Sequence, residues 1–196
     1  MASMQQADHG VNQLSDEEKA AIGEAMKEAE SLAKNIKEKA VYSSQDKEVL
    51  VTGVMKNFHR FDMELYKITS WTGKVMDPPP VLIRKNSIGT FVHKGTSNLP
   101  VSNSKGAIIY SCNKKYPHLG WLLAWDKSDL HNKVYVEAGK LDRIKEIPDC
   151  VILQKLDASG NISRYWDNDT GASANAEIRN WDESIATLGV SLDQEL

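Results

Sequence analysis

The stretch from residue 105 to residue 137 constrains the fold more than any other part of the chain. It contains three apolar or alternating runs, residues 107–112, 119–125 and 133–137, which are separated by turn-forming polar clusters. Runs of this length and composition are typical of β-strands. The sequence therefore predicts three consecutive antiparallel strands at the centre of a sheet, with Tyr110 and Trp121 among the side chains that the sheet buries.

Residues 15–41 show the pattern of one long amphipathic helix. Ser15 and Glu18 form a capping box, and apolar residues then recur at spacings of three and four. The apolar stripe is narrow and rich in alanine, and the polar faces mix Lys with Glu, so we expect the helix to pack on a sheet. Residues 1–14 are polar, lack periodicity and are expected to be flexible.

Strand-like runs continue on both sides of the central stretch. Residues 48–54 and 63–71 are similar in length and are predicted to form an antiparallel pair, while residues 151–156 and 162–166 flank a turn and are predicted to form a hairpin. Further short strands are expected at residues 81–83, 88–93 and 174–178, an edge or connector at the three prolines 78–80, and a short C-terminal helix from Asn180 to Gly189. Many short strands after one helix favour a mainly β protein, a β-sandwich that occupies residues 47–190.

Composition narrows the function and the location. A length of 196 residues fits one domain with a helical appendage, and a net charge of -3 argues against a dedicated nucleic-acid binder. The two cysteines, Cys112 and Cys150, lie in apolar strand-like runs, where we expect small buried side chains, as is common in a reducing compartment. No secretory signal pattern and no apolar run of membrane-spanning length is found, so we expect a cytoplasmic protein without a transmembrane segment, whose oligomeric state is left open.

No residue pattern indicates an enzyme, a cofactor or a metal site. The five histidines show no pair at helical or zinc-finger spacing, and neither a GxSxG elbow nor a P-loop occurs. Asp167 and Asp169 precede Gly171 as in a calcium-binding loop, but the glycine comes one position too early for an EF-hand. We interpret this loop as an ordinary polar turn, and calcium binding by Asp167 and Asp169 is left open.

Aromatic residues supply the candidate ligand contacts, although core packing is the competing interpretation. Trp71 and Trp125 each end a strand next to a polar turn, which predicts indole rings at the rim of the sandwich. Tyr116 lies in a neighbouring loop, and Tyr135 lies on the third central strand. Such rings hold a sugar by stacking or a choline ammonium by cation–π contact, so Trp71, Tyr116, Trp125 and Tyr135 are the predicted ligand-binding residues.

The run KGAIIYSCNKKYPHLGWLLAWD, followed by NKVYVE and preceded by EVLVTGVMKNF and PPPVLIRKNSIGTFVHKG, resembles the small jasmonate-induced proteins of plants. More remotely, the glycine-led strand 106–111 and the two strands after it are similar to the actinoporin-like superfamily of sea-anemone pore formers and fungal fruit-body lectins. The resemblance covers residues 47–137 and implies an actinoporin-like antiparallel β-sandwich. The segment DKSDLHN lacks the Tyr and Trp cluster of the actinoporin phosphocholine site, and the N-terminal helix lacks an apolar, aromatic face, which argues against pore formation.

The expected function is that of a non-enzymatic, jasmonate- or stress-responsive plant defence protein. Its expected partner is a glycan or a lipid head group, bound at the rim of the sandwich in a lectin-like manner. Two alternatives stay open: a membrane-active module that uses the N-terminal helix, and an enzyme that acts on RNA. The enzyme would require a paired acid and base, for which the sequence shows no recognisable spacing.

Overall fold

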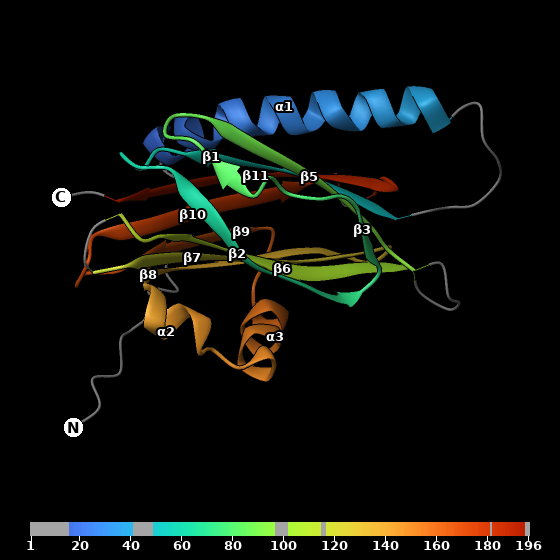
Figure 1. The fold of residues 1–196 in the computed structure, drawn as a ribbon. Coiled ribbons are helices and arrows are strands. Elements are labelled where there is room, and N and C mark those ends of the chain that lie inside the picture. The colour runs from blue at the N-terminus through green and yellow to red at the C-terminus, as the bar shows by residue number, and fades with distance from the viewer. Residues whose placement is uncertain (1–15, 41–48, 97–101, 115–116, 181, 195–196) are drawn as a thin grey trace.

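The computed structural model describes residues 16–40, 49–96, 102–114, 117–180 and 182–194. The segment 1–14, which we expected to be flexible, lies outside these residues. Within the described ranges, eleven strands form two sheets, and three helices cover the outer faces of both sheets (Figure 1). The six-stranded sheet has the order β3 (Lys74–Asp77), β5 (Ile88–Lys94), β1 (Leu50–Asn57), β11 (Ile185–Gln194), β10 (Ala172–Arg179) and β9 (Ile162–Trp166). The five-stranded sheet has the order β4 (Leu82–Ile83), β2 (Met63–Thr72), β6 (Asn103–Cys112), β7 (Leu119–Ser128) and β8 (Asn132–Lys140).

The three predicted central strands are confirmed as β6, β7 and β8, which pair antiparallel in sequence order. Every residue of β7 is buried. One face of β7 packs against the other sheet, and α2 (Leu141–Lys145) and α3 (Asp149–Ala158) cover the opposite face (Figure 1). Because both faces are covered, this strand reads as a nearly continuous apolar run rather than an alternating one.

Tyr110 and Trp121 lie in the core between the sheets, as predicted, and each is 1 % exposed. They face each other across the β6–β7 pair. The polar group of each side chain has a hydrogen-bond partner. The Tyr110 hydroxyl donates to Pro80 O at 2.5 Å, and Trp121 Nε1 donates to Asp193 O at 3.1 Å. Trp121 therefore joins the five-stranded sheet to β11 of the other sheet.

The N-terminal helix α1 (Asp16–Ala40) packs lengthwise on the outer face of the six-stranded sheet, as expected (Figure 1). Ala25 and Ala29 are completely buried, and small side chains let the helix approach the strands closely. Thr52 Oγ1 on β1 lies 3.2 Å from Ala29 O, a further direct contact between sheet and helix. Since this packing occupies the alanine stripe, the membrane-active alternative requires the helix to leave the sheet. No helix in the described part of the chain has the length and apolar character to cross a membrane.

The predicted antiparallel pairing of residues 48–54 with 63–71 is wrong, because β1 and β2 belong to different sheets. The chain crosses between the sheets after Asn57, and β1 pairs instead with β5 and, in parallel, with β11. The completely buried Asn57 side chain fixes this crossover: Nδ2 lies 3.0 Å from Phe61 O and 3.0 Å from Ile83 O.

Two elements of the C-terminal part differ from their predictions. Residues 151–156 belong to helix α3 and not to a strand, and Ile152 and Leu156, four residues apart, pack on the five-stranded sheet. The hairpin partner of β9 is β10. The short helix expected at residues 180–189 is replaced by strand β11, so the short helices of this fold precede β9 rather than end the chain. Trp181, which we placed on that helix, lies outside the described residues.

The cysteines behave differently from each other. Cys112 is buried in the core, as expected. Cys150 is exposed on α3, so its predicted burial is wrong. It lies on a helix, and only one stripe of a helix that covers a sheet can face the sheet.

Candidate functional site

Trp125 lies in the core rather than at the rim, so its predicted position is wrong. Its side chain is 1 % exposed, and its ring centroid lies 5.0 Å from that of Phe91 and 5.2 Å from that of His93. The indole Nε1 donates to Ser104 Oγ at 3.2 Å. Strand β7 continues to Ser128, three residues beyond the apolar run, which explains why a residue at the apparent strand end is enclosed. A ligand would have to open the sandwich to reach this ring.

Trp71 and Tyr135 come together beneath α3 instead of around an open rim. Both pack, half-buried, against the apolar cluster on the outer face of the five-stranded sheet. Trp71 Nε1 donates to Asp149 Oδ2 at 3.0 Å, and the Tyr135 hydroxyl donates to the Glu137 carboxylate. Ligand contact by these two side chains stays a prediction, and Tyr116 lies outside the described residues.

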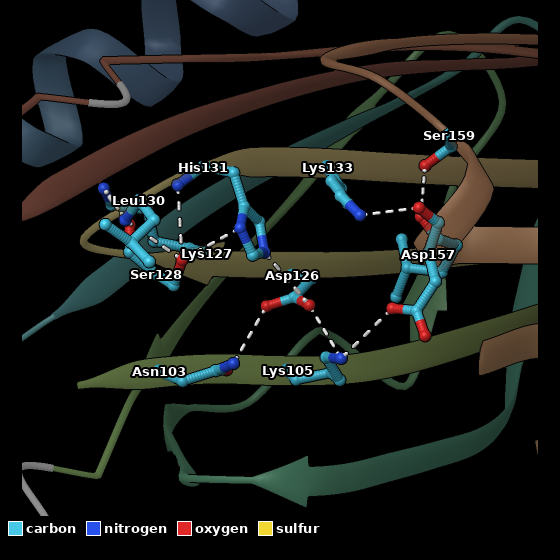
Figure 2. A network of polar contacts seen from close by, with 11 residues as sticks. Asn103, Lys105, Asp126, Lys127, Ser128, Leu130, His131, Lys133, Asp157 and Ser159 are labelled. Atoms are coloured by element: carbon cyan, nitrogen blue, oxygen red, sulfur yellow. Dashed lines mark hydrogen bonds and ion pairs between the residues drawn. The ribbon is translucent and has the colours of Figure 1, made fainter. Parts of the chain in front are cut away.

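A polar network ties α3 to the end of the five-stranded sheet near the β7–β8 turn, as Figure 2 shows. Asp126, which is 2 % exposed, accepts a hydrogen bond from Asn103 Nδ2 at 3.0 Å and lies 2.7 Å from Lys105 Nζ. Lys105 also lies 3.6 Å from Asp157 at the end of α3, and Lys133 Nζ donates to Asp157 O at 2.6 Å. Burial lowers the pKa of Lys105, but the two aspartates outweigh burial and raise the pKa above its usual value. The network therefore fixes the helix on the strands.

The same turn places a serine, a histidine and an aspartate in a row, which are the residue types of a hydrolase triad. Ser128 Oγ lies 3.2 Å from His131 Nδ1, and His131 Nε2 lies 3.3 Å from Asp126 Oδ2 without hydrogen-bonding geometry. However, Ser128 is 1 % exposed, and its Oγ accepts from the backbone N–H groups of Leu130 and His131 at 3.1 and 3.2 Å. A nucleophile must be accessible to its substrate, and the Ser128 hydroxyl is not. Its hydrogen bonds show that Ser128 stabilises the turn. The Ser128, His131 and Asp126 side chains therefore give no support to an enzyme that acts on RNA.

The acidic loop at Asp167 is a turn, in agreement with the interpretation of its sequence. The backbone N–H of Gly171 donates to Asp167 O at 2.8 Å, and Gly171 has a φ of 69°, which favours glycine. The Thr170 hydroxyl donates to Asp167 Oδ2. Across the described residues, no three His, Cys, Asp or Glu side chains converge on a point that suits a metal ion. Calcium binding by Asp167 and Asp169 stays an untested idea.

Residues 81–88, here called the exposed edge segment, carry apolar side chains on the outside of the protein. Val81 is 76 % exposed, Leu82 is 42 % exposed and Ile88 is 37 % exposed. Arg84 and Lys85 lie between them and are also exposed. Within the described part of the chain, neither cation has a carboxylate at ion-pair distance. Exposed aliphatic side chains interleaved with free cations are typical of surfaces that meet a lipid bilayer.

The backbone of the exposed edge segment is anchored, so the exposure of its side chains is not a result of a loose loop. The backbone N–H of Leu65 donates to Val81 O at 2.8 Å, and Asn57 Nδ2 donates to Ile83 O and, at 3.2 Å, to Arg84 O. Ile83 points inward and is 1 % exposed. Because alternate residues of a strand point to opposite faces, the burial of Ile83 turns Leu82 outward. Tyr66, which follows Leu65 on β2, is 49 % exposed.

Sequence reasoning did not single out this segment, because residues 81–83 read as one more apolar strand. Two signals could have identified it. The prolines 78–80 indicated an edge, where apolar side chains are less often covered. The pair Arg84 and Lys85 directly after the apolar residues would not suit a buried strand.

The exposed edge segment and the polar network lie at opposite ends of the five-stranded sheet. Leu82 pairs with Glu64, which pairs with Ser111 near one end of β6. Asn103 at the other end of β6 pairs with Ser128. Leu130 in the β7–β8 turn is 75 % exposed, close to the 76 % exposure of Val81 at the opposite end.

No protein-family model and no curated protein matches the sequence. Among solved structures, the crystal structure of the lipid-binding protein Nakanori is similar, with a TM-score of 0.65 and 20 % sequence identity. The match covers 99 % of this chain and 94 % of that chain. A likeness at this identity shows the fold alone, and the resemblance to jasmonate-induced proteins stays a prediction. The chain has the actinoporin-like β-sandwich fold, with a long N-terminal helix on one sheet and two short helices on the other.

Proposed function

We propose that the protein is a non-enzymatic lipid-binding protein that docks on bilayer surfaces through the exposed edge segment. The observation that carries this proposal is Val81, an aliphatic side chain that is 76 % exposed on an anchored backbone. Beside it lie the exposed Arg84 and Lys85, for which the described residues provide no carboxylate at ion-pair distance. Such a side chain can enter the interfacial region of a bilayer without the entropy cost of ordering a loop, because its backbone is already fixed. The lipid-binding role of the structural neighbour supports the proposal.

The basic side chains set the expected lipid preference. Arg84 and Lys85 would each gain about 1 kcal/mol near an anionic leaflet. We therefore propose that the bound head groups are anionic phospholipids rather than the neutral glycans that were the other expectation.

Sedimentation with vesicles tests the proposal. Val81→Ser should weaken binding about tenfold, since withdrawing one aliphatic side chain from the bilayer costs about 1–2 kcal/mol. Leu130→Ser is the matched control, because Leu130 is equally exposed but lies at the opposite end of the sheet. Vesicles of phosphatidylcholine alone should bind more weakly than vesicles that also contain phosphatidylserine. Equal losses for the two variants, or no binding to either vesicle, would overturn the proposal.

The sequence resemblance supports a finer proposal. We propose a jasmonate- or stress-responsive role in plant defence, exercised from the cytoplasm. Transcript levels after jasmonate treatment and the location of a fluorescent fusion test these two points. An unchanged transcript would remove the jasmonate connection without affecting the lipid proposal.

A further inference from the structure

The turn between β4 and β5 carries a serine in a distinctive sequence context. Ser87 follows Arg84 by three residues and Lys85 by two, and Ile88 comes directly after it. Among all the serines and threonines of the sequence, Ser87 is the only one with basic residues at both of these spacings. Protein kinases select their substrates through charge patterns, and kinases whose substrate clefts are lined with carboxylates prefer cations at these two positions. The sequence therefore indicates that Ser87 is a candidate phosphate acceptor.

The Ser87 hydroxyl is available for modification. The side chain is half-buried, and its Oγ has no hydrogen-bond partner among the described residues. Because Oγ is not one of the enclosed polar atoms that lack a partner, it is in contact with solvent. Ser70 is also exposed and follows Lys67 by three residues, but its Oγ lies 3.0 Å from Nε2 of the buried His93. Sequence context and accessibility therefore point to the same serine.

The backbone of this turn can open locally. Kinases bind the segment that accepts the phosphate in an extended conformation, so the turn has to open. One backbone hydrogen bond closes it, from the N–H of Ser87 to Arg84 O at 3.0 Å. Asn86 has a φ of 57°, a left-handed conformation that is less favourable for a residue with a Cβ atom and that extension would relieve. An exposed turn of this kind belongs to the parts of a protein that open most readily.

A phosphate on Ser87 would reverse the charge around the turn. Lys56 Nζ donates to Asn86 O at 2.9 Å, and Asp62 Oδ1 accepts from the backbone N–H of Lys85 at 2.9 Å. Together with the carboxylate that pairs with Lys56, the charged side chains of the turn and of its contacts are Glu24, Lys56, Asp62, Arg84 and Lys85. These are three cations and two carboxylates, a net charge of +1. A phosphoserine carries a charge of about −2 at neutral pH, so the net charge would become about −1.

We propose that Ser87 is a phosphorylation site for kinases that recognise basic sequences, and that its phosphate releases the protein from anionic bilayers. This inference rests on the proposed docking through the exposed edge segment and adds its regulation. In the reaction, Ser87 Oγ forms a bond to the γ-phosphorus of ATP, the bond between this phosphorus and the departing ADP breaks, and the hydroxyl proton passes to a carboxylate of the kinase. The phosphate then lies beside Arg84 and Lys85, where it neutralises both cations and repels anionic head groups.

Phosphorylation of the full chain tests the first half of the proposal. The protein is incubated with MgATP and the catalytic subunit of cAMP-dependent protein kinase, and mass spectrometry locates the phosphate. We expect it on Ser87, and Ser87→Ala should remain unmodified. Ser31→Ala is the matched control, because Ser31 is exposed on α1 but has no basic residue at either spacing, and this variant should be modified like the unchanged protein. No phosphate on Ser87, or phosphate mainly on another residue such as Ser70, would overturn the proposal.

Sedimentation with vesicles that contain phosphatidylserine tests the second half. The phosphorylated protein should bind about thirtyfold more weakly than the untreated protein, because each of the two basic side chains that the phosphate neutralises contributes about fivefold. Ser87→Glu and Ser87→Gln form a matched pair that needs no kinase, since they are similar in size and differ by one charge. The Glu variant should bind about fivefold more weakly than the Gln variant, and this difference should vanish on vesicles of phosphatidylcholine alone.

The outcomes separate this proposal from the one on which it rests. Vesicle binding that is unchanged by phosphorylation of Ser87 would overturn the switch and leave the proposed docking intact. No binding of the untreated protein to vesicles that contain phosphatidylserine would refute the docking itself, and the switch with it.

Discussion

Mild acid is expected to destabilise the protein through His93. This ring is completely buried, with Nδ1 2.8 Å from Ser104 Oγ and Nε2 3.0 Å from Ser70 Oγ. The indole of Trp125 can only donate, and it donates to Ser104 Oγ. We therefore assign the Ser104 hydroxyl hydrogen to His93 Nδ1 and the imidazole hydrogen to Nε2, facing Ser70. The neutral ring is satisfied on both nitrogens, and neither partner is a carboxylate that would favour a second proton.

Burial lowers the pKa of His93 from 6.5 to about 4. Well above pH 6.5 the ring is neutral in the folded and the unfolded protein, so it contributes no pH dependence. Between pH 6.5 and about pH 4 the unfolded chain binds a proton that the folded protein does not, so the free energy of unfolding falls as the pH falls. The difference between the two pKa values corresponds to about 3 kcal/mol, of which about 2 kcal/mol is lost between about pH 7 and about pH 5.

Urea unfolding at these two pH values, followed by tryptophan fluorescence, measures the effect. His93→Gln keeps a neutral donor and acceptor between the two serines but cannot take up the proton. We expect the unfolding free energy of the unchanged protein to fall by about 2 kcal/mol more than that of the variant, because all other titrating groups are shared. Parallel pH profiles for the two proteins, or an NMR titration of the His93 ring near its ordinary pKa, would refute the reasoning.

Two further predictions concern stability. Burial alone would raise the pKa of Glu137, but hydrogen bonds from Tyr135 and Arg143 and the charge of Lys155 outweigh burial and lower this pKa. The ionised carboxylate therefore stabilises the fold above pH 4.5. This stabilisation is lost as the pH falls through the pKa that Glu137 has in the folded protein. Glu137→Gln should lower the free energy of unfolding at neutral pH by about 3 kcal/mol, as measured by calorimetry. It should also make the free energy of unfolding less dependent on pH below pH 4.5. A variant that loses as much stability in acid as the unchanged protein would contradict this prediction. Gly106→Ala should cost about 1–3 kcal/mol in thermal unfolding, because a Cβ atom there would lie 2.7 Å from Thr69 O and 2.7 Å from the Trp125 ring. Its control is Gly23→Ala on α1, where the added Cβ meets nothing within 4 Å; equal Tm values for the two variants would contradict the prediction.

Sequence periodicity predicted the elements whose partners are neighbours in the chain. Strands β6, β7 and β8 follow one another in the chain and pair in that order. Each apolar run and the turn after it therefore suffice to predict the strand and its pairing partner. The helix α1 was equally predictable, because a capping box and one stripe of small residues define it locally. Where pairing depends on distant segments, as for β1 with β11, a single sequence contains no corresponding signal.

Short apolar runs were ambiguous for a physical reason. Residues 151–156 are apolar enough for a buried strand, and only their packing through Ile152 and Leu156 against an outer sheet face reveals a helix. The rim position predicted for Trp125 was wrong because the polar residues that follow it were taken to end the strand. Asp126, Lys127 and Ser128 instead continue β7 and are buried. The charged network around Asp126 compensates the burial of that carboxylate, and its members lie on three strands and a helix.

The exposed edge segment was not predictable from composition. It depends on which side of β4 faces solvent. The aromatic residues that first suggested ligand contacts are mostly used to fill the sandwich and to seat α3. This use follows from their large apolar area, which a two-layer fold needs in its interior.

The parallel pairing of β1 with β11 also has a consequence for biogenesis. Strand β1 is an inner strand of the six-stranded sheet, yet one of its two partners, β11, leaves the ribosome after all the other strands of the two sheets described here. Helix α1 packs on both β1 and β11, so part of its packing surface is missing until β11 has been synthesised. The nascent chain must therefore keep an alanine-lined helix and an unpaired strand edge apart from other chains while the five-stranded sheet forms. A chain that stalls before Ile185 would present both to chaperones and proteases, so quality control would remove incomplete copies before they fold.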